Sequence, residues 1–153
     1  MKHKFFVVAL SLALLTLGLW GCAAAGEPVK AKTPVRAQWA EEALSNYPAY
    51  DQFSADSSEH NVKVLYSTKN SVKNFKVLAL TCEGVDEEGV MKFAVRELYT
   101  LKKLTPKRPL VVTMVFYGDL PNNGISYVDA KGITQRFAVG LSGEDGSLQL
   151  VKF

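Results

Sequence analysis

The spacing of apolar residues predicts several β-strands in the middle of the chain. Residues 61–68 alternate between apolar and polar positions, and residues 75–82 are apolar on both faces apart from Lys76. The polar residues 69–74 lie between them, so we predict two strands joined by a turn. Residues 109–118 form a nearly continuous apolar run, which is typical of a central strand covered on both faces.

Three further alternating segments occupy the C-terminal part, at residues 125–130, 133–141 and 147–153. The short segments that separate them contain glycine. Tight glycine turns between alternating segments predict an antiparallel meander.

The strongest helical pattern covers residues 86–104. Asp86 stands where an N-cap is expected, Lys102 and Lys103 fall in the last turn, and Pro106 follows. We therefore predict a long amphipathic helix with one face packed on the sheet. Its apolar stripe at helical spacing consists of Met91, Ala94, Val95, Leu98 and Leu101.

A second, short helix is predicted at residues 37–46, because Pro48 prevents much continuation. The polar segment that follows, up to residue 60, is expected to be a long loop. Helices set apart from a mostly antiparallel sheet of about five to six strands define an α+β fold.

The N-terminal segment has the pattern of an export signal. Lys2 and Lys4 precede sixteen uncharged residues, 5–20. A membrane-spanning helix needs about 20 apolar residues. The shorter run, the one-sided positive charge and the small residues that follow indicate a secretory signal peptide.

The end of this segment, Leu19-Trp20-Gly21-Cys22, resembles the lipobox of bacterial lipoproteins. Trp20 occupies a position that is usually small or β-branched in that family. The resemblance implies a diacylglycerol on the Cys22 sulfur, cleavage before Cys22 and a further acyl chain, such as palmitate, on the new amino group. The alternative is cleavage after Ala25, which would release a soluble secreted protein.

The resemblance implies a signal peptide at 1–21 and an acylated cysteine at 22. Small residues, prolines and scattered charge predict a tether up to residue 36, and the remaining 37–153 have the length of one globular domain. The resemblance also implies attachment to the cell envelope, outside the cytoplasm. Ala23 follows the cysteine where an aspartate would resemble an inner-membrane retention signal. The implied address is therefore the periplasmic face of the outer membrane in a Gram-negative cell, or the outer face of the plasma membrane in a Gram-positive one.

Composition adds little to this picture. The chain has 18 Lys and Arg against 15 Asp and Glu, a formal net charge of +3. Two of the positive charges belong to the predicted signal, so the mature chain is nearly balanced and gives no argument for nucleic-acid binding. With Cys22 acylated, Cys82 would be the remaining thiol, and no internal disulfide is expected.

Catalytic and metal-binding chemistry is weakly represented. Cys82 and His60 could in principle form a thiolate–imidazole pair, but the strand position of Cys82 favours a small buried hydrophobe. A lone histidine falls short of the three or four ligands of a zinc site. Asp51, Asp56 and Glu59 lack the spacing of a calcium loop. We expect no catalytic residue, metal or cofactor.

Two groups of residues are candidates for binding. Trp39, Tyr47, Tyr50 and Phe53 could form an aromatic platform for a sugar or peptide, or instead cover an open side of the core. A basic cluster could contact anionic lipid headgroups or an acidic polymer, or instead complement a helix dipole and solvate a loop. Its members are Lys102, Lys103, Lys107 and Arg108.

We therefore favour a lipid-anchored envelope lipoprotein with a non-catalytic domain that binds a protein or an envelope polymer. The alternative is an exported hydrolytic or thiol enzyme that uses Cys82 and His60.

Overall fold

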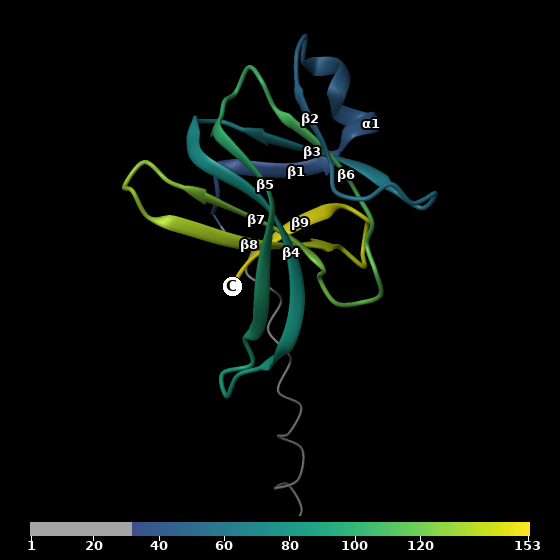
Figure 1. Cartoon of the computed structure of the whole chain (residues 1–153), viewed down its shortest axis with the longest axis vertical. Helices are drawn as coiled ribbons and strands as arrows, with labels where there is room; N and C mark the ends of the chain where they lie inside the picture. The colour runs from purple at the N-terminus through teal and green to yellow at the C-terminus, as the bar shows by residue number, and fades with distance from the viewer. Residues whose placement is uncertain (1–31) are drawn as a thin grey trace, which may run out of the picture.

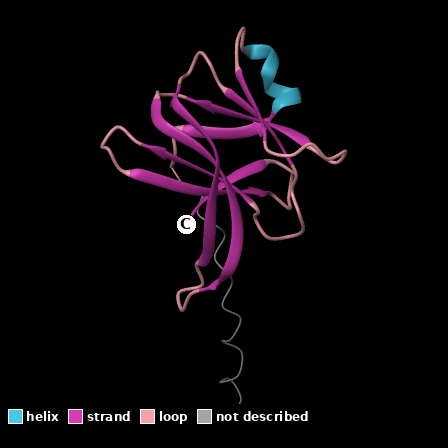
Figure 2. Cartoon of the chain, viewed as in Figure 1, coloured by secondary structure: helices cyan, strands magenta, loops and turns pink. Residues whose placement is uncertain are grey.

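Residues 32–153 are described by the computed structural model, and 57% of them lie in β-strands while 6% are helical. The strands form two sheets that pack face to face, and the short helix lies at one edge of the molecule (Figures 1 and 2). The elements, in chain order, are β1 (Val35–Trp39), α1 (Ala40–Ala43), the 3-10 helix η1 (Leu44–Asn46), β2 (Asp51–Ser54), β3 (Val62–Thr68), β4 (Val72–Val85), β5 (Met91–Leu104), β6 (Leu110–Met114), β7 (Asn123–Val128), β8 (Thr134–Leu141) and β9 (Leu148–Lys152).

One sheet has four strands in the order β1-β3-β6-β2, and the other has five in the order β5-β4-β7-β8-β9. All neighbouring strands are antiparallel except β2 and β6, which run parallel. The β7-β8-β9 meander confirms the prediction for the C-terminal part.

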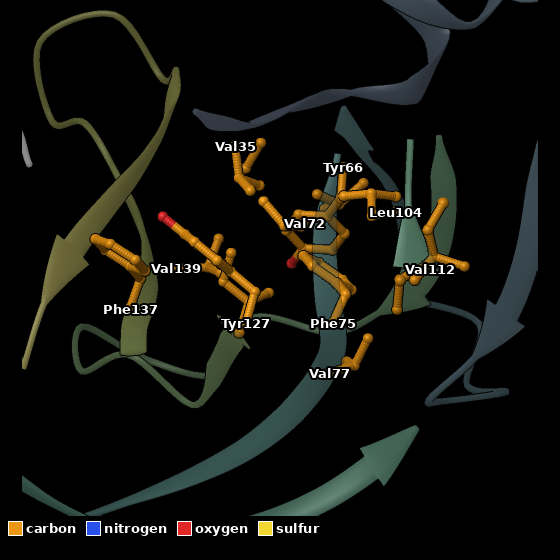
Figure 3. Close-up of a cluster of buried hydrophobic side chains, with 14 of the residues drawn as sticks. Val35, Tyr66, Val72, Phe75, Val77, Leu104, Val112, Tyr127, Phe137 and Val139 are labelled. Carbon is orange, nitrogen blue, oxygen red and sulfur yellow. The ribbon is translucent and has the colours of Figure 1, made fainter. Parts of the chain in front are cut away.

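The space between the two sheets holds the main hydrophobic core (Figure 3). Tyr66 of the four-stranded sheet packs against Phe75 of the five-stranded sheet, with ring centroids 5.6 Å apart. Tyr127 and Phe137 stack beside them at 5.8 Å. Full burial of an apolar side chain of this size contributes about 1.5–3 kcal/mol, so these residues bind the sheets together.

The long helix predicted for residues 86–104 is wrong, and with it the α+β fold class; the fold is mostly β. Residues 86–90 instead form the hairpin turn between β4 and β5. The Asp86 carboxylate accepts hydrogen bonds from the amides of Glu88 (3.0 Å) and Val90 (2.8 Å). An N-cap satisfies backbone amides in the same way, so this sequence signal fits both structures.

A β-bulge explains the apparent helical period of β5. Val77 on β4 pairs with Tyr99, whereas the next residue, Leu78, pairs with Glu97. Leu98 is therefore the extra residue, and the alternation of side chains shifts there. Two alternating runs joined by such a shift place apolar residues three and four positions apart, which resembles a helical stripe.

Several strand predictions are confirmed. β3 covers residues 62–68 of the predicted 61–68, β4 contains 75–82, and β6 lies within 109–118 as an interior strand. However, β3 and β4 belong to different sheets, so the turn between them is a crossover and not a hairpin connection.

The segments near the N-terminus of the described chain differ in part from the prediction. Residues 37–39 lie in β1, so the helical part of the predicted 37–46 is only 40–46. The predicted loop contains the short strand β2, which pairs with β6. A strand of four residues carries too weak a period to recognise in a polar segment.

The predicted signal peptide 1–21, Cys22 and most of the expected tether lie outside the described residues. The described part of that tether is tied to the sheets. Thr33 shares a hydrogen bond of 2.7 Å with the Tyr127 hydroxyl, and β1 begins at Val35. Within residues 32–153, no helix has the length and hydropathy needed to cross a bilayer.

Candidate functional site

The aromatic residues predicted as a binding platform lie in separate places. Tyr47 and Tyr50 pack on the four-stranded sheet beside α1. Trp39 donates a hydrogen bond of 3.1 Å to the Gly146 carbonyl and packs edge to face on Phe116. Phe53 stacks on Tyr99, with ring centroids 4.6 Å apart. Each aromatic ring therefore closes a different part of the fold, and together they form no common platform.

The predicted basic cluster lies at one end of β5 and in the turn that follows. Lys102, Lys103 and Lys107 are exposed and form no ion pair with any described residue. Arg108 is different, because its guanidinium contacts the Asp51 carboxylate at 2.6 Å. The hydrogen bond from Arg108 and the charge of Asp51 raise the pKa of the guanidinium.

Cys82 and His60 do not form a catalytic pair in the described structure. The Cys82 thiol is half-buried and contacts the Gly84 carbonyl at 3.7 Å. His60 is exposed in the loop before β3, and no contact joins it to Cys82. Among residues 32–153, the hydrogen bond recorded for the thiol is to a backbone carbonyl and not to a base that would activate it.

The acidic residues of the same loop do not form a joint site either. Asp56 accepts hydrogen bonds from the Ser58 amide (2.7 Å) and from the Tyr117 hydroxyl (3.2 Å). The Ser58 amide is the main reason why the pKa of Asp56 is lowered, and the bond to Asp56 raises the pKa of Tyr117. Across residues 32–153, no three His, Cys, Asp or Glu side chains are grouped to hold a metal ion.

The candidate site is the outer face of the five-stranded sheet, which is the side turned away from the four-stranded sheet. Leu78, Leu80 and Ala138 form a small apolar cluster there, with Phe93 and Phe153 packed against it. Phe93 and Phe153 meet edge to face, with centroids 5.0 Å apart. No described helix covers this outer face (Figure 2).

A groove of about 240 Å³ adjoins the apolar cluster on the outer face. It arises from the strand register, because Ser126 on β7 lies directly between Lys76 on β4 and Arg136 on β8. A short side chain between two long ones leaves a hollow, about 9.6 Å across between the outer strands. The other lining residues are Asn74, Leu78, Val95, Glu97, Val128 and Thr134.

Some polar groups of this groove have an interaction partner in the described chain, and others have none. Lys76 forms an ion pair with Glu97. The Arg136 guanidinium has no such partner among the described residues. Ser126 is 5% exposed, and its hydroxyl has no hydrogen-bond partner in the described chain. A guanidinium and a hydroxyl on one wall can bind a carboxylate or another oxyanion.

The outer face continues into an arm formed by residues 80–95. β4 pairs with β7 only as far as Ala79, whereas its pairing with β5 continues to Val85 and Met91. The arm is therefore a two-stranded ribbon beyond the third strand, and it projects from the body in Figure 1. Val85 is 62% exposed and Val90 is 45% exposed at its tip.

The sequence prediction missed the residues of this face. Ser126 and Arg136 lie on neighbouring strands of the predicted meander, but Lys76 is far from them in the chain, and only the strand order places the three in one row. A signal for the arm was present, since Phe93 and Val95 alternate with polar or small neighbours. The helical prediction for the same segment concealed it.

Comparison with known proteins gives no family for this chain. No family model, curated protein or solved structure matches it.

Proposed function

We propose that this protein is a lipid-anchored envelope lipoprotein whose β-domain binds a protein partner through the outer face of the five-stranded sheet. The observation that carries the proposal is an apolar cluster, covered only by the partly exposed rings of Phe93 and Phe153, beside a groove that holds an unpaired guanidinium and an unpartnered hydroxyl. The anchor rests on the lipobox at Cys22.

The composition of the outer face favours a protein over a polysaccharide. Phe93, Phe153 and Val95 offer apolar and aromatic surface, which forms the centre of many protein interfaces. Arg136 is also among the residue types enriched there. A partner that matches both features would place apolar side chains on the cluster and a carboxylate in the groove.

Site-directed cross-linking tests the proposal. A photoreactive label is attached to Thr134→Cys, at the rim of the groove, in a Cys82→Ser background. The matched control carries the label at Glu42→Cys, which is exposed on α1 beside the other sheet. In native membranes we expect an adduct of defined mass from Thr134→Cys and none of that mass from Glu42→Cys.

Charge reversal then decides whether the groove makes the contact. Arg136→Glu should abolish the Thr134→Cys adduct, because the introduced carboxylate would repel the partner's carboxylate in the groove. Arg36→Glu is the matched control, an exposed arginine on β1 of the other sheet, and it should leave the adduct intact. Equal adducts from both label positions, or equal loss with both arginine variants, would contradict the proposed binding face.

The anchor needs a separate test. Cys22→Ala should move the full chain from the membrane fraction to the soluble fraction, because two or three acyl chains provide stable attachment. A chain that stays in the membrane fraction after this change would exclude lipidation at Cys22 as the anchor.

A further inference from the structure

Charges are segregated between the two ends of the described domain, although its total charge is nearly balanced. The topology places the starts of β1, β4 and β6 at the same end as the ends of β3, β5 and β7. This basic end has Asp51 and Asp129 as its acidic residues. Its basic residues are Lys32, Arg36, Lys69, Lys73, Lys102, Lys103, Lys107, Arg108 and Lys131.

The opposite end and the arm are acidic. Their basic residues are Lys63, Lys92 and Arg96. Figure 1 shows the β7-β8 turn of the basic end on the left, far from the arm at the bottom. The acidic residues are Asp56, Glu59, Glu83, Asp86, Glu87, Glu88, Asp119, Glu144 and Asp145.

The basic end contains an unfavourable arrangement that an anion would relieve. Lys73 on β4 and Lys103 on β5 lie directly opposite each other in the strand register. Like charges in such a pair are destabilising. Neither lysine has an ion-pair partner among residues 32–153. An anionic surface at this end would replace the mutual repulsion with attraction.

The chain also enters the domain at the basic end. The Lys69 amide donates a hydrogen bond of 3.1 Å to the Pro34 carbonyl, and Thr33 is held by Tyr127. Ten residue steps separate Cys22 from Lys32, and a chain of that length reaches at most about 36 Å. An acyl group on Cys22 would therefore keep this end within reach of the bilayer surface.

We propose that the basic end docks on the anionic headgroups of the membrane that holds the lipid anchor. The proposal rests on the proposed function for its first attachment, and it adds a second contact that orients the domain. The charge of the end fits an anionic lipid surface, and each lysine near such a surface contributes to the affinity. Docking in this orientation places the acidic loops and the arm toward the aqueous side.

Vesicle binding by a chain without acyl groups tests this second contact. The mature chain with Cys22→Ala is mixed with vesicles of phosphatidylcholine, either pure or containing phosphatidylglycerol. We expect binding to the anionic vesicles only, and loss of that binding at high salt. The variants Lys73→Gln, Lys103→Gln and Lys107→Gln should each weaken binding about fivefold.

Matched controls come from the acidic end. Lys63→Gln and Lys92→Gln remove the same charge, and each should change the affinity by less than about twofold. Equal losses in both sets, equal binding to neutral vesicles, or tighter binding to a soluble anionic polymer than to vesicles would overturn the lipid assignment.

The two proposals fail in different ways. If the full chain needs Cys22 for membrane attachment but the unacylated chain ignores anionic vesicles, the docking contact is wrong and the anchor stands. If the unacylated chain binds anionic vesicles but Cys22→Ala leaves cell fractionation unchanged, the anchor is wrong and the docking contact stands.

Discussion

The two sheets share one core, but their outer faces differ in what covers them. The chain covers the four-stranded sheet with its own helical segment, which buries Leu65 and Val111 beneath Ala40 and Tyr47. The five-stranded sheet has no such cover in the described structure, and Val95 remains 37% exposed there. On the five-stranded sheet, Leu78, Leu80 and Ala138 are covered only by the partly exposed rings of Phe93 and Phe153. Partly exposed apolar side chains that adjoin a polar groove are typical of an interaction site. This difference makes the outer face of the five-stranded sheet the candidate binding face.

The largest change in stability is expected when one aliphatic side chain is removed from each outer face in turn. Leu65→Ala should lower the free energy of unfolding by about 2–5 kcal/mol, because Leu65 is fully buried under the helical segment. Val95→Ala should cost less than about 1 kcal/mol, since much of this side chain already contacts water. Urea unfolding measures both. Similar losses would mean that both faces are equally packed.

Glycine substitutions probe how closely the outer face is packed at its centre. A Cβ at Gly124 would lie 2.9 Å from Leu80 Cδ1 and 3.0 Å from the Phe137 carbonyl oxygen, whereas a Cβ at Gly140 meets nothing within 4 Å. Gly124→Ala should destabilise by about 1–3 kcal/mol. Gly140→Ala should change stability by less than about 0.5 kcal/mol. If the two variants unfold at the same urea concentration, the apolar cluster is not closely packed.

Alkaline pH tests the core that both sheets share. Burial raises the pKa of Tyr66, so its folded form stays protonated at pH values where the unfolded chain ionises. Its contribution to stability is therefore complete below the unfolded pKa of about 10 and decreases as the pH rises above it. Relative to Tyr66→Phe, the wild type should lose about 1.4 kcal/mol per pH unit there. Parallel stability curves for the two proteins would contradict the assigned burial.

The smallest effect is expected at the tip of the arm. Asp86→Ala removes the acceptor for the Glu88 and Val90 amides, which should cost about 1 kcal/mol within the hairpin. Hydrogen exchange should speed up about fivefold at Val90, while the Ile125 amide in the sheet exchanges as before. Equal acceleration at both amides would show that the arm and the body unfold as one unit.

The sequence predicted most strands but not the placement of the site. The alternation of apolar and polar residue types identified β3, β8 and β9, each of which has at least one exposed position among its more buried ones. It failed at β5, since the bulge at Leu98 and the capping chemistry of Asp86 imitate a helix. Periodicity reports local geometry, so it could not show that the chain crosses between sheets after β3.

The candidate site depended even more on long-range order. The row of Lys76, Ser126 and Arg136 exists because β4 and β8 flank β7. The local sequence patterns of these segments do not determine the strand order. The aromatic residues around Trp39 and Tyr50 were more conspicuous in the sequence, yet they are used to close the fold.

Solvent accessibility in the native membrane tests the binding face most directly. Two variants in a Cys82→Ser background, each with one introduced cysteine, Val95→Cys on the outer face and Glu42→Cys on α1, are labelled with a water-soluble maleimide. We predict that Val95→Cys reacts at least about tenfold more slowly in native membranes than after purification, while Glu42→Cys reacts at the same rate in both. Equal rates for Val95→Cys in the two preparations would show that no partner covers the outer face.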